Sequence, residues 1–184
     1  MGKGLLGVIA AIVIMAAMFF SSYNGLVSMN ENVTGKWSQV ENQLQRRNDL
    51  IPNLVNTVKG YAAHETEVFK AVSDARAKLG GSKTVAETTA ANNEMNSALS
   101  RLLVVAESYP DLKANTNFQQ LQDELAGTEN RIAVARKDYN DAVQVYNAKI
   151  KSLPTSLYAG ACGFTAKDYF KADTAAQKVP QVKF

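Results

Sequence analysis

Residues 33–79 read VTGKWSQVENQLQRRNDLIPNLVNTVKGYAAHETEVFKAVSDARAKL. Apolar side chains recur in this stretch at alternating steps of four and three residues, a spacing that places them on one stripe of a long helix. Only Arg47 and Glu65 interrupt the stripe. Its members are Val33, Trp37, Val40, Leu44, Ile51, Leu54, Val58, Tyr61, Val68, Val72, Ala75 and Leu79.

Pro52 lies inside this stretch. A proline breaks or kinks a helix because it lacks an amide hydrogen and its ring clashes with the carbonyl four residues earlier. The alternation of four and three does not slip across Pro52, and neither Gly35 nor Gly60 is accompanied by turn residues. We therefore predict one kinked helix over residues 33–79, and the alternative is a break at Pro52.

The N-terminal part of the chain is apolar. Residues 4–20 contain no polar side chain, and residues 4–30 contain no charged side chain. Together with residues 21–27 this run is about long enough to cross a hydrocarbon core. A cleaved signal peptide is the alternative, but the run ends in Met18-Phe19-Phe20 without the small residues of a cleavage site. We predict an uncleaved transmembrane anchor at residues 1–28.

The flanking charges predict the orientation of this anchor. Lys3 and the amino terminus are the nearest positive charges on the short side, whereas Lys36, Arg46 and Arg47 lie further away on the other. The positive-inside rule then places the N-terminus in the cytoplasm and the rest of the chain outside the inner membrane. The apolar stripe extends back to Phe19, so the anchor and the long helix are predicted to form one rod.

Two further helices follow Gly80-Gly81. The second begins with a capping box, Thr84 with Glu87, and ends before Pro110. The third runs from about Asn117 to Leu153 and has a long apolar stripe that includes Leu125 and Ile132. We therefore predict an all-α fold with an anchor at 1–28, an antiparallel bundle at 29–153 and an irregular tail at 154–184. The bundle has three long helices, or four if Pro52 breaks the first. One short helix is expected at residues 166–172.

Few residues in the chain are suited to catalysis or metal binding. His64 is the only histidine and Cys162 the only cysteine, and no nucleophile elbow or phosphate-binding loop occurs. The net charge of +3 is dispersed over the chain, without the basic patch that binds nucleic acid. We predict that the protein is not an enzyme, holds no cofactor or metal and does not bind nucleic acid.

Two polar features fall near the predicted core. Arg47 lies on the stripe, and either it belongs to a solvated face or it pairs with Glu129 or Asp141 of the third helix. The pairs Tyr139-Asn140 and Tyr146-Asn147 repeat at a heptad interval. We interpret them as core tyrosines with neighbouring amides, which need no ligand.

Several segments resemble the bacterial LemA family. They are WSQVE (37–41), QLQRR (43–47), DLIPNLV (49–55), LSRLL (99–103), YPDLKA (109–114) and TENRIA (128–133). The resemblance implies a single-pass membrane protein with a helical-bundle domain. It supplies no catalytic residues, and it implies no established biochemical activity.

The predicted helix lengths suggest self-association. At 1.5 Å per residue, residues 30–79 would rise about 75 Å, while the second and third helices would cover about 39 and 55 Å. Starting from Gly80, these two helices would leave residues 33–51 without a partner in the same chain. We expect a homo-oligomer to cover this apolar seam. The candidate self-association or partner surface consists of Trp37, Val40, Leu44, Arg47 and Ile51.

These patterns favour a membrane-anchored helical scaffold or interaction protein of the bacterial envelope. Its expected partners are the lipid bilayer, further copies of itself and other envelope proteins. The alternative is an envelope sensor that binds a ligand or lipid. A scaffold should keep an apolar seam after folding, whereas a sensor should have a closed core with a polar-lined cavity.

Overall fold

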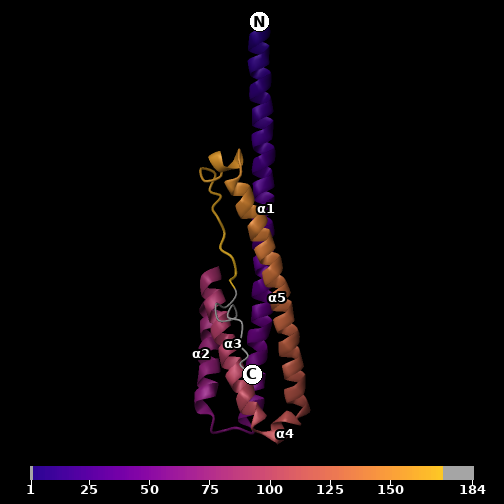
Figure 1. Ribbon diagram of the computed structural model, residues 1–184, viewed down its shortest axis with the longest axis vertical. Helices are drawn as coiled ribbons and strands as arrows, with labels where there is room; N and C mark the ends of the chain where they lie inside the picture. Colours follow the sequence, from indigo (N-terminus) through magenta and orange to yellow (C-terminus); the bar gives the residue numbers. More distant parts are fainter. Residues whose placement is uncertain (1, 172–184) are drawn as a thin grey trace, which may run out of the picture.

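A computed structural model describes residues 2–171 of the 184-residue chain, and this part contains helices and turns but no strand (Figure 1). The helices are α1 (Lys3–Lys59), α2 (Thr66–Gly81), α3 (Val85–Glu107), α4 (Pro110–Lys113) and α5 (Thr116–Lys151), followed by the 3-10 helix η1 (Thr155–Leu157). The predicted all-α fold is confirmed.

Helix α1 is continuous over 57 residues and contains Pro52. The side chains on either side of the proline are in the core, where Ile51 is 1 % and Leu54 0 % exposed. Burial of the stripe outweighs the local cost of the proline, because most of the stability of a helix in a protein comes from packing of its apolar face. The predictions that Pro52 does not break the helix and that anchor and bundle share one rod are confirmed.

The chain turns at Gly60, which the sequence analysis did not predict. The amides of Tyr61 and Ala62 both donate to the carbonyl oxygen of Val58, at 3.0 and 2.9 Å, and so end the helix after Lys59. Glycine is a weak helix former, so the cost of stopping there is small. The expected single helix over residues 33–79 is therefore wrong: α2 folds back beside α1 and packs on α3.

Side-chain caps begin the later helices, at Thr84 as predicted and at Asn115, two residues before the expected start near Asn117. The Glu87 amide donates to Thr84 Oγ1 at 3.1 Å, and the Thr84 amide donates to Glu87 Oε2 at 3.2 Å, which completes the predicted capping box. At the start of α5 the Asn115 side chain accepts from the Phe118 amide at 3.1 Å. Each cap satisfies amides that have no partner inside the helix.

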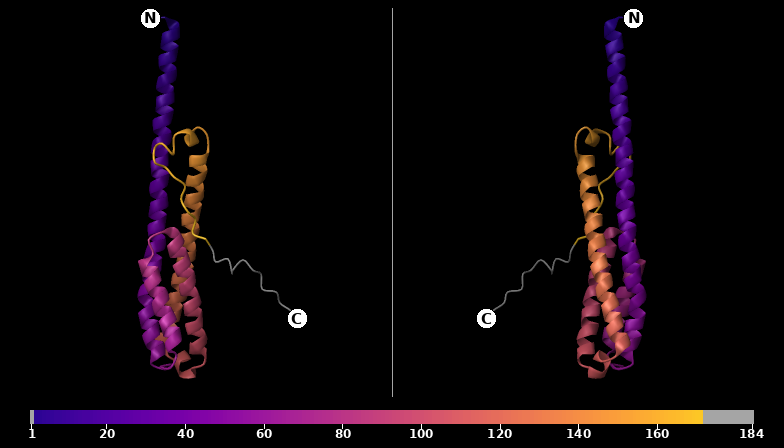
Figure 2. Two further views of the ribbon diagram at one scale, coloured as in Figure 1. Left: turned by 90° about the vertical axis from the view of Figure 1, so that its left-hand side faces the viewer. Right: turned by 90° about the vertical axis from the view of Figure 1, so that its right-hand side faces the viewer.

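Helix α1 runs the length of the molecule, α5 returns beside it, and the α2–α3 hairpin covers its part furthest from the N-terminus (Figures 1 and 2). Helix α1 packs mainly on α5, and α2 mainly on α3. The core has two clusters. The one nearer the N-terminus includes Val40, Leu44, Tyr139, Tyr146 and Phe170, and the distal one includes Ile51, Leu54, Phe69, Met95, Leu102 and Phe118.

The half of α1 nearest the anchor does not lack a partner, contrary to the expectation from helix lengths. Because α1 ends at Lys59, α5 starts at the far end of the rod, and its 36 residues rise about 54 Å along it. The end of α5 reaches the anchor, where Thr155 Oγ1 lies 3.5 Å from Ser22 Oγ. The seam is therefore covered from within the chain.

Helix α1 is the only described helix that is long and apolar enough to cross a membrane, and none of its apolar window is buried. After η1 the chain continues without helix through residues 164–171. The short helix expected at residues 166–172 is wrong over 166–171, because the backbone there bonds to side chains of α5. Residue 172 lies outside the described residues.

Candidate interaction surfaces

The residues predicted to form a self-association surface are packed inside the chain. Val40, Leu44, Arg47 and Ile51 are between 0 % and 5 % exposed. Trp37 is partly buried, and its ring centroid lies 5.1 Å from that of Tyr139. The premise that these five side chains have no partner in their own chain is wrong. Trp37, Val40 and Leu44 pack in the cluster that includes α5 and the tail, Ile51 packs in the distal cluster, and Arg47 contacts Glu129 and Asn92.

Arg47 forms an ion pair with Glu129 of α5, so it does not belong to a solvated face. Its Nη1 lies 2.8 Å from Glu129 Oε2, in an ion pair that is not aligned as a hydrogen bond. The same nitrogen donates to Asn92 Oδ1 at 3.2 Å. The other candidate, Asp141, pairs with Lys137. Burial lowers the pKa of Arg47, and the charge of Glu129 opposes this shift, so the guanidinium stays charged in a nearly dry site.

An open groove lies beside this ion pair. Helix α3 packs mainly on α2, and α5 packs mainly on α1, so the backbones of α3 and α5 stay apart although side chains of both helices belong to the distal cluster. The space between them, here called the α3–α5 groove, has a volume of about 470 Å³. Its lining residues are Arg47, Leu54, Asn96, Leu99, Ser100, Leu103, Gln122, Leu125, Ala126 and Glu129.

The lining of the α3–α5 groove is largely apolar. Leu54 forms its floor in the core, and Leu99, Leu103 and Leu125 belong to the two helices on either side of it. The exposed fraction of Leu103 is 36 %. Asn96 Oδ1 is buried and has no hydrogen-bond partner among the described residues. The exposed leucine surface is typical of a protein contact, whereas Asn96 Oδ1 needs a hydrogen-bond donor.

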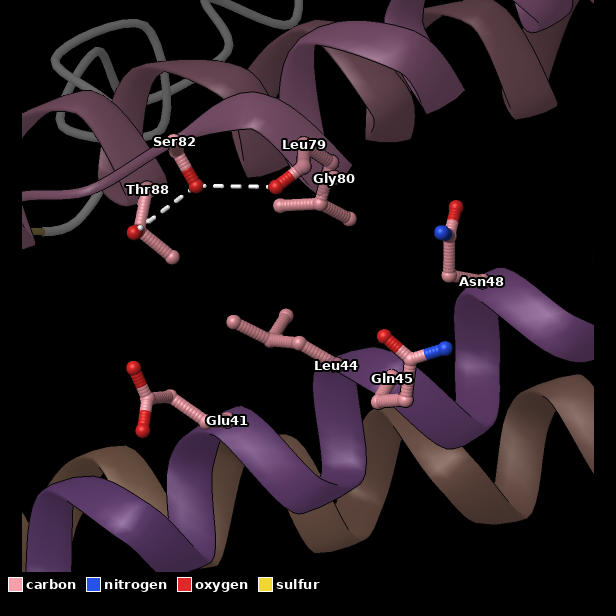
Figure 3. A pocket seen from close by; sticks show the side chains of 8 residues that line it. All are labelled: Glu41, Leu44, Gln45, Asn48, Leu79, Gly80, Ser82 and Thr88. Carbon is pink, nitrogen blue, oxygen red and sulfur yellow. Dashed lines mark hydrogen bonds between the residues drawn. The ribbon is translucent and has the colours of Figure 1, made fainter.

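A second hollow is smaller and more polar. It has a volume of about 170 Å³ and lies between α1 and the turn from α2 to α3, with Leu44 pointing into it (Figure 3). At its rim Ser82 Oγ donates to the Leu79 carbonyl at 2.8 Å and lies 3.0 Å from Thr88 Oγ1. Glu41 is the only carboxylate in the lining, so this hollow offers no pair of acidic groups for acid–base chemistry.

Among the described residues, no group of three or more histidine, cysteine, aspartate or glutamate side chains could hold a metal ion. His64 lies in the turn between α1 and α2, and Cys162 follows η1 at the other end of α5. The chain therefore does not bring its only histidine and its only cysteine together. That the protein has no catalytic residue and no cofactor stays a prediction.

Two asparagines of α5 hold the tail, a role that the sequence analysis missed. Asn140 Nδ2 donates to the Phe170 carbonyl, and its Oδ1 accepts from the Phe170 amide, both at 2.9 Å. Asn147 makes the same pair of bonds with Lys167, again at 2.9 Å. We call this arrangement the asparagine clamp.

The spacing of the asparagine clamp explains why it fits an extended chain. Its two asparagines are a heptad apart, a rise of about 10.5 Å in a helix. Phe170 and Lys167 are three residues apart, which spans about 10 Å in an extended backbone. The repeat of Tyr-Asn at a heptad interval was the available signal. A heptad interval places the two asparagine side chains on the same side of the helix. In the structure both of them bind the backbone of the tail.

Aromatic contacts complete the attachment of the tail. Phe170 is 1 % exposed and lies under the guanidinium of Arg136, whose carbon is 4.3 Å from the ring centroid. Tyr139 donates its hydroxyl to the Asp168 carbonyl at 2.7 Å. Burial, with a contribution from the nearby Asp168 charge, raises the pKa of Tyr139 to about 12, so the hydroxyl keeps the proton that it donates.

An exposed apolar helix that continues into a helical bundle defines a class, the single-pass membrane proteins with a helical-bundle domain. The family model described as the LemA family matches residues 36–184, and the chain belongs to this family. The resemblance noted in the sequence is thereby confirmed.

Relatives of the chain include magnetosome proteins. MamQ 2 and MamQ 1 of Paramagnetospirillum magneticum are each 29 % identical to it over 196 residues, which cover 91 % of this chain and 71 % of theirs. MamQ of Magnetospirillum gryphiswaldense is 27 % identical, covering 92 % of this chain and 74 % of its own. Protein LemA of Metamycoplasma hominis is 25 % identical over 138 residues, covering 74 % and 63 %. None of these names states an enzymatic activity.

Proposed function

We propose that the protein is a membrane-anchored interaction protein of the bacterial envelope that associates with a second copy of itself through the α3–α5 groove. In this proposal residues 1–28 are the anchor, residues 29–153 form the interaction domain and residues 154–184 are its tail. The observation that carries it is the apolar groove that remains between α3 and α5 in the fold of residues 2–171.

The shape of the groove supports an interaction protein over a sensor. A sensor would need a closed cavity with converging polar groups. Here Leu99, Leu103 and Leu125 line an open groove, and the exposed fraction of Leu103 is 36 %. Apolar surface of this kind is unfavourable in water and is typical of a protein contact.

The geometry of anchoring favours a second copy as the partner. The helices beside the groove run along the direction of α1, which contains the anchor (Figure 1). Copies in one membrane therefore carry their grooves at the same height. A two-fold axis along the membrane normal would bring two identical grooves face to face, which is the commonest way in which proteins form dimers.

Disulfide cross-linking in membranes tests this proposal. In a Cys162→Ser background, Leu103→Cys is expected to give a covalent dimer on mild oxidation, because the two-fold contact brings the same position of both copies together. Arg101→Cys is the matched control, since Arg101 is exposed on the same helix but does not line the groove. Dimer yield is measured on non-reducing gels. Equal yields for the two variants, or a monomeric Leu103→Cys protein, would contradict the proposal.

We infer that the bundle lies outside the inner membrane. The inference rests on Lys3, which precedes the anchor, and on the absence of positive charge between Gly4 and Lys36. Protease added to spheroplasts is expected to digest the bundle, as followed by immunoblotting. A cytoplasmic protein that must stay intact in the same sample is the control, and protection of the bundle until the cells are lysed would reverse the orientation.

A further inference from the structure

The two most exposed large apolar side chains of the described residues lie at the end of the bundle that meets the anchor. Leu153 is 76 % exposed and Leu157 is 79 % exposed, more than any apolar side chain described within the anchor itself. Leu153 lies between α5 and η1, and Leu157 is the last residue of η1. Neither of them belongs to a core cluster. Their exposure is not explained by the fold of the chain.

Contacts with α1 fix the position of this segment along the helix. Tyr158 donates its hydroxyl to Ser22 Oγ at 2.6 Å. Its ring centroid lies 4.8 Å from that of Phe19, in an edge-to-face arrangement. Tyr23 contacts Phe164 of the tail at 5.5 Å in the same manner. The segment after α5 is therefore attached to the last turns of the apolar part of α1.

These last turns are where the bilayer ends. A helix needs about 20 apolar residues to cross the hydrocarbon core, and the apolar run begins at Gly4. The boundary then falls close to Phe19, Phe20 and Tyr23, and tyrosine is enriched at membrane–water interfaces. Tyr158 and Phe164, whose rings contact Phe19 and Tyr23 edge to face, lie at the same level.

The charges around the segment complement an anionic membrane surface. Lys149 and Lys151 lie in the last turn of α5, and neither forms an ion pair with a described residue. Lys149 lines a surface hollow together with Met18, Ser21 and Ser22 of α1. Lysine side chains beside a membrane helix reach the phosphates of lipid headgroups.

We propose that residues 149–158 form a second membrane contact, in which Leu153 and Leu157 enter the edge of the bilayer and Lys149 and Lys151 bind anionic lipid phosphates. The anchor and this contact together hold the bundle upright on the membrane. This proposal depends on the anchor and does not depend on self-association. A short apolar segment with adjacent lysines is a common design for binding in the plane of a membrane surface.

Spin labels on the full-length protein in lipid vesicles test the contact. Leu157→Cys and Val104→Cys are made in the Cys162→Ser background, and both positions are exposed, so the cores are left intact. The label at residue 157 is expected to be accessible to oxygen and protected from a water-soluble nickel reagent, and the label at residue 104 should show the reverse. Equal nickel accessibility at the two positions would overturn the proposal.

Lipid composition tests the role of the lysines. In vesicles with phosphatidylglycerol, Lys149→Gln with Lys151→Gln is expected to increase the nickel accessibility of the label at residue 157, because the attraction to lipid phosphate is lost. In vesicles of phosphatidylcholine alone the change should be smaller. No change in either lipid would overturn the headgroup contact. A label that is protected in cell membranes but accessible in both vesicle types would show that a protein covers the segment, which would overturn the proposal.

Discussion

Replacing Ile132 by alanine is expected to lower the free energy of unfolding by about 2 to 5 kcal/mol. Ile132 is 0 % exposed in the cluster between α1 and α5. The shorter side chain loses apolar burial and leaves a cavity, because the long helices around it cannot collapse freely. Urea unfolding of the full-length protein in detergent, followed by circular dichroism, measures this loss.

Two further substitutions, at an exposed and at a partly buried position of α5, serve as controls for Ile132→Ala. Lys137→Ala should change the stability by less than about 0.5 kcal/mol, because Lys137 is exposed and its pair with Asp141 is formed in water. Leu125 was predicted to belong to the core, but it is only partly buried and lines the α3–α5 groove. Leu125→Ala should therefore cost only about 1 kcal/mol. Equal and small effects of all three substitutions would contradict the burial of Ile132 between α5 and α1.

The second large effect is expected at the buried ion pair. Glu129→Leu leaves the guanidinium of Arg47, which is 5 % exposed, with Asn92 as its only partner in the described chain. Removing one member of a buried pair costs about 3 to 5 kcal/mol. The side chain of Glu129 is 42 % exposed, and water reaching the vacated site will offset part of this loss. We expect a destabilisation of about 2 kcal/mol, measured by the same unfolding experiment.

The exposed pair Arg46–Glu124 provides a matched control, because it also joins α1 to α5 but both of its side chains are about half exposed. Glu124→Leu is expected to cost less than about 0.5 kcal/mol. Replacing the whole buried network by Arg47→Met, Asn92→Leu and Glu129→Leu should restore most of the stability, since no uncompensated charge remains. A triple variant as unstable as Glu129→Leu would show that packing and not charge is responsible.

Much of the fold follows from local patterns in the sequence. The anchor, the continuity of α1 across Pro52, the capping box at Thr84 and the extent of α5 were all predicted. Each depends on residues close together in the chain, because helix periodicity, capping and membrane length are properties of one segment. For Arg47 the sequence left a solvated face or a pair with Glu129 or Asp141 as alternatives, and only the packing of the helices selects Glu129.

The turn at Gly60 could not be read from the apolar stripe. A stripe with an unbroken register describes a continuous helix, and it also describes a helical hairpin whose two halves both bury their apolar faces. Only the packing of α2 on α3, and of α1 on α5, selects the hairpin. Because of this choice α5 starts at the far end of α1. Val40 and Leu44 are therefore core residues, and Trp37 packs partly buried against the same cluster instead of lying on a free surface.

The sequence by itself determined that the chain is helical, anchored in a membrane and without an evident set of catalytic groups. The tertiary structure alone decided which surfaces remain for partners. It covered the predicted seam, left the α3–α5 groove open, and brought the tail to Asn140 and Asn147. The physical reason is that these features join residues far apart in the chain. Their formation depends on how long helices pair, and the periodicity of one helix does not specify its neighbour.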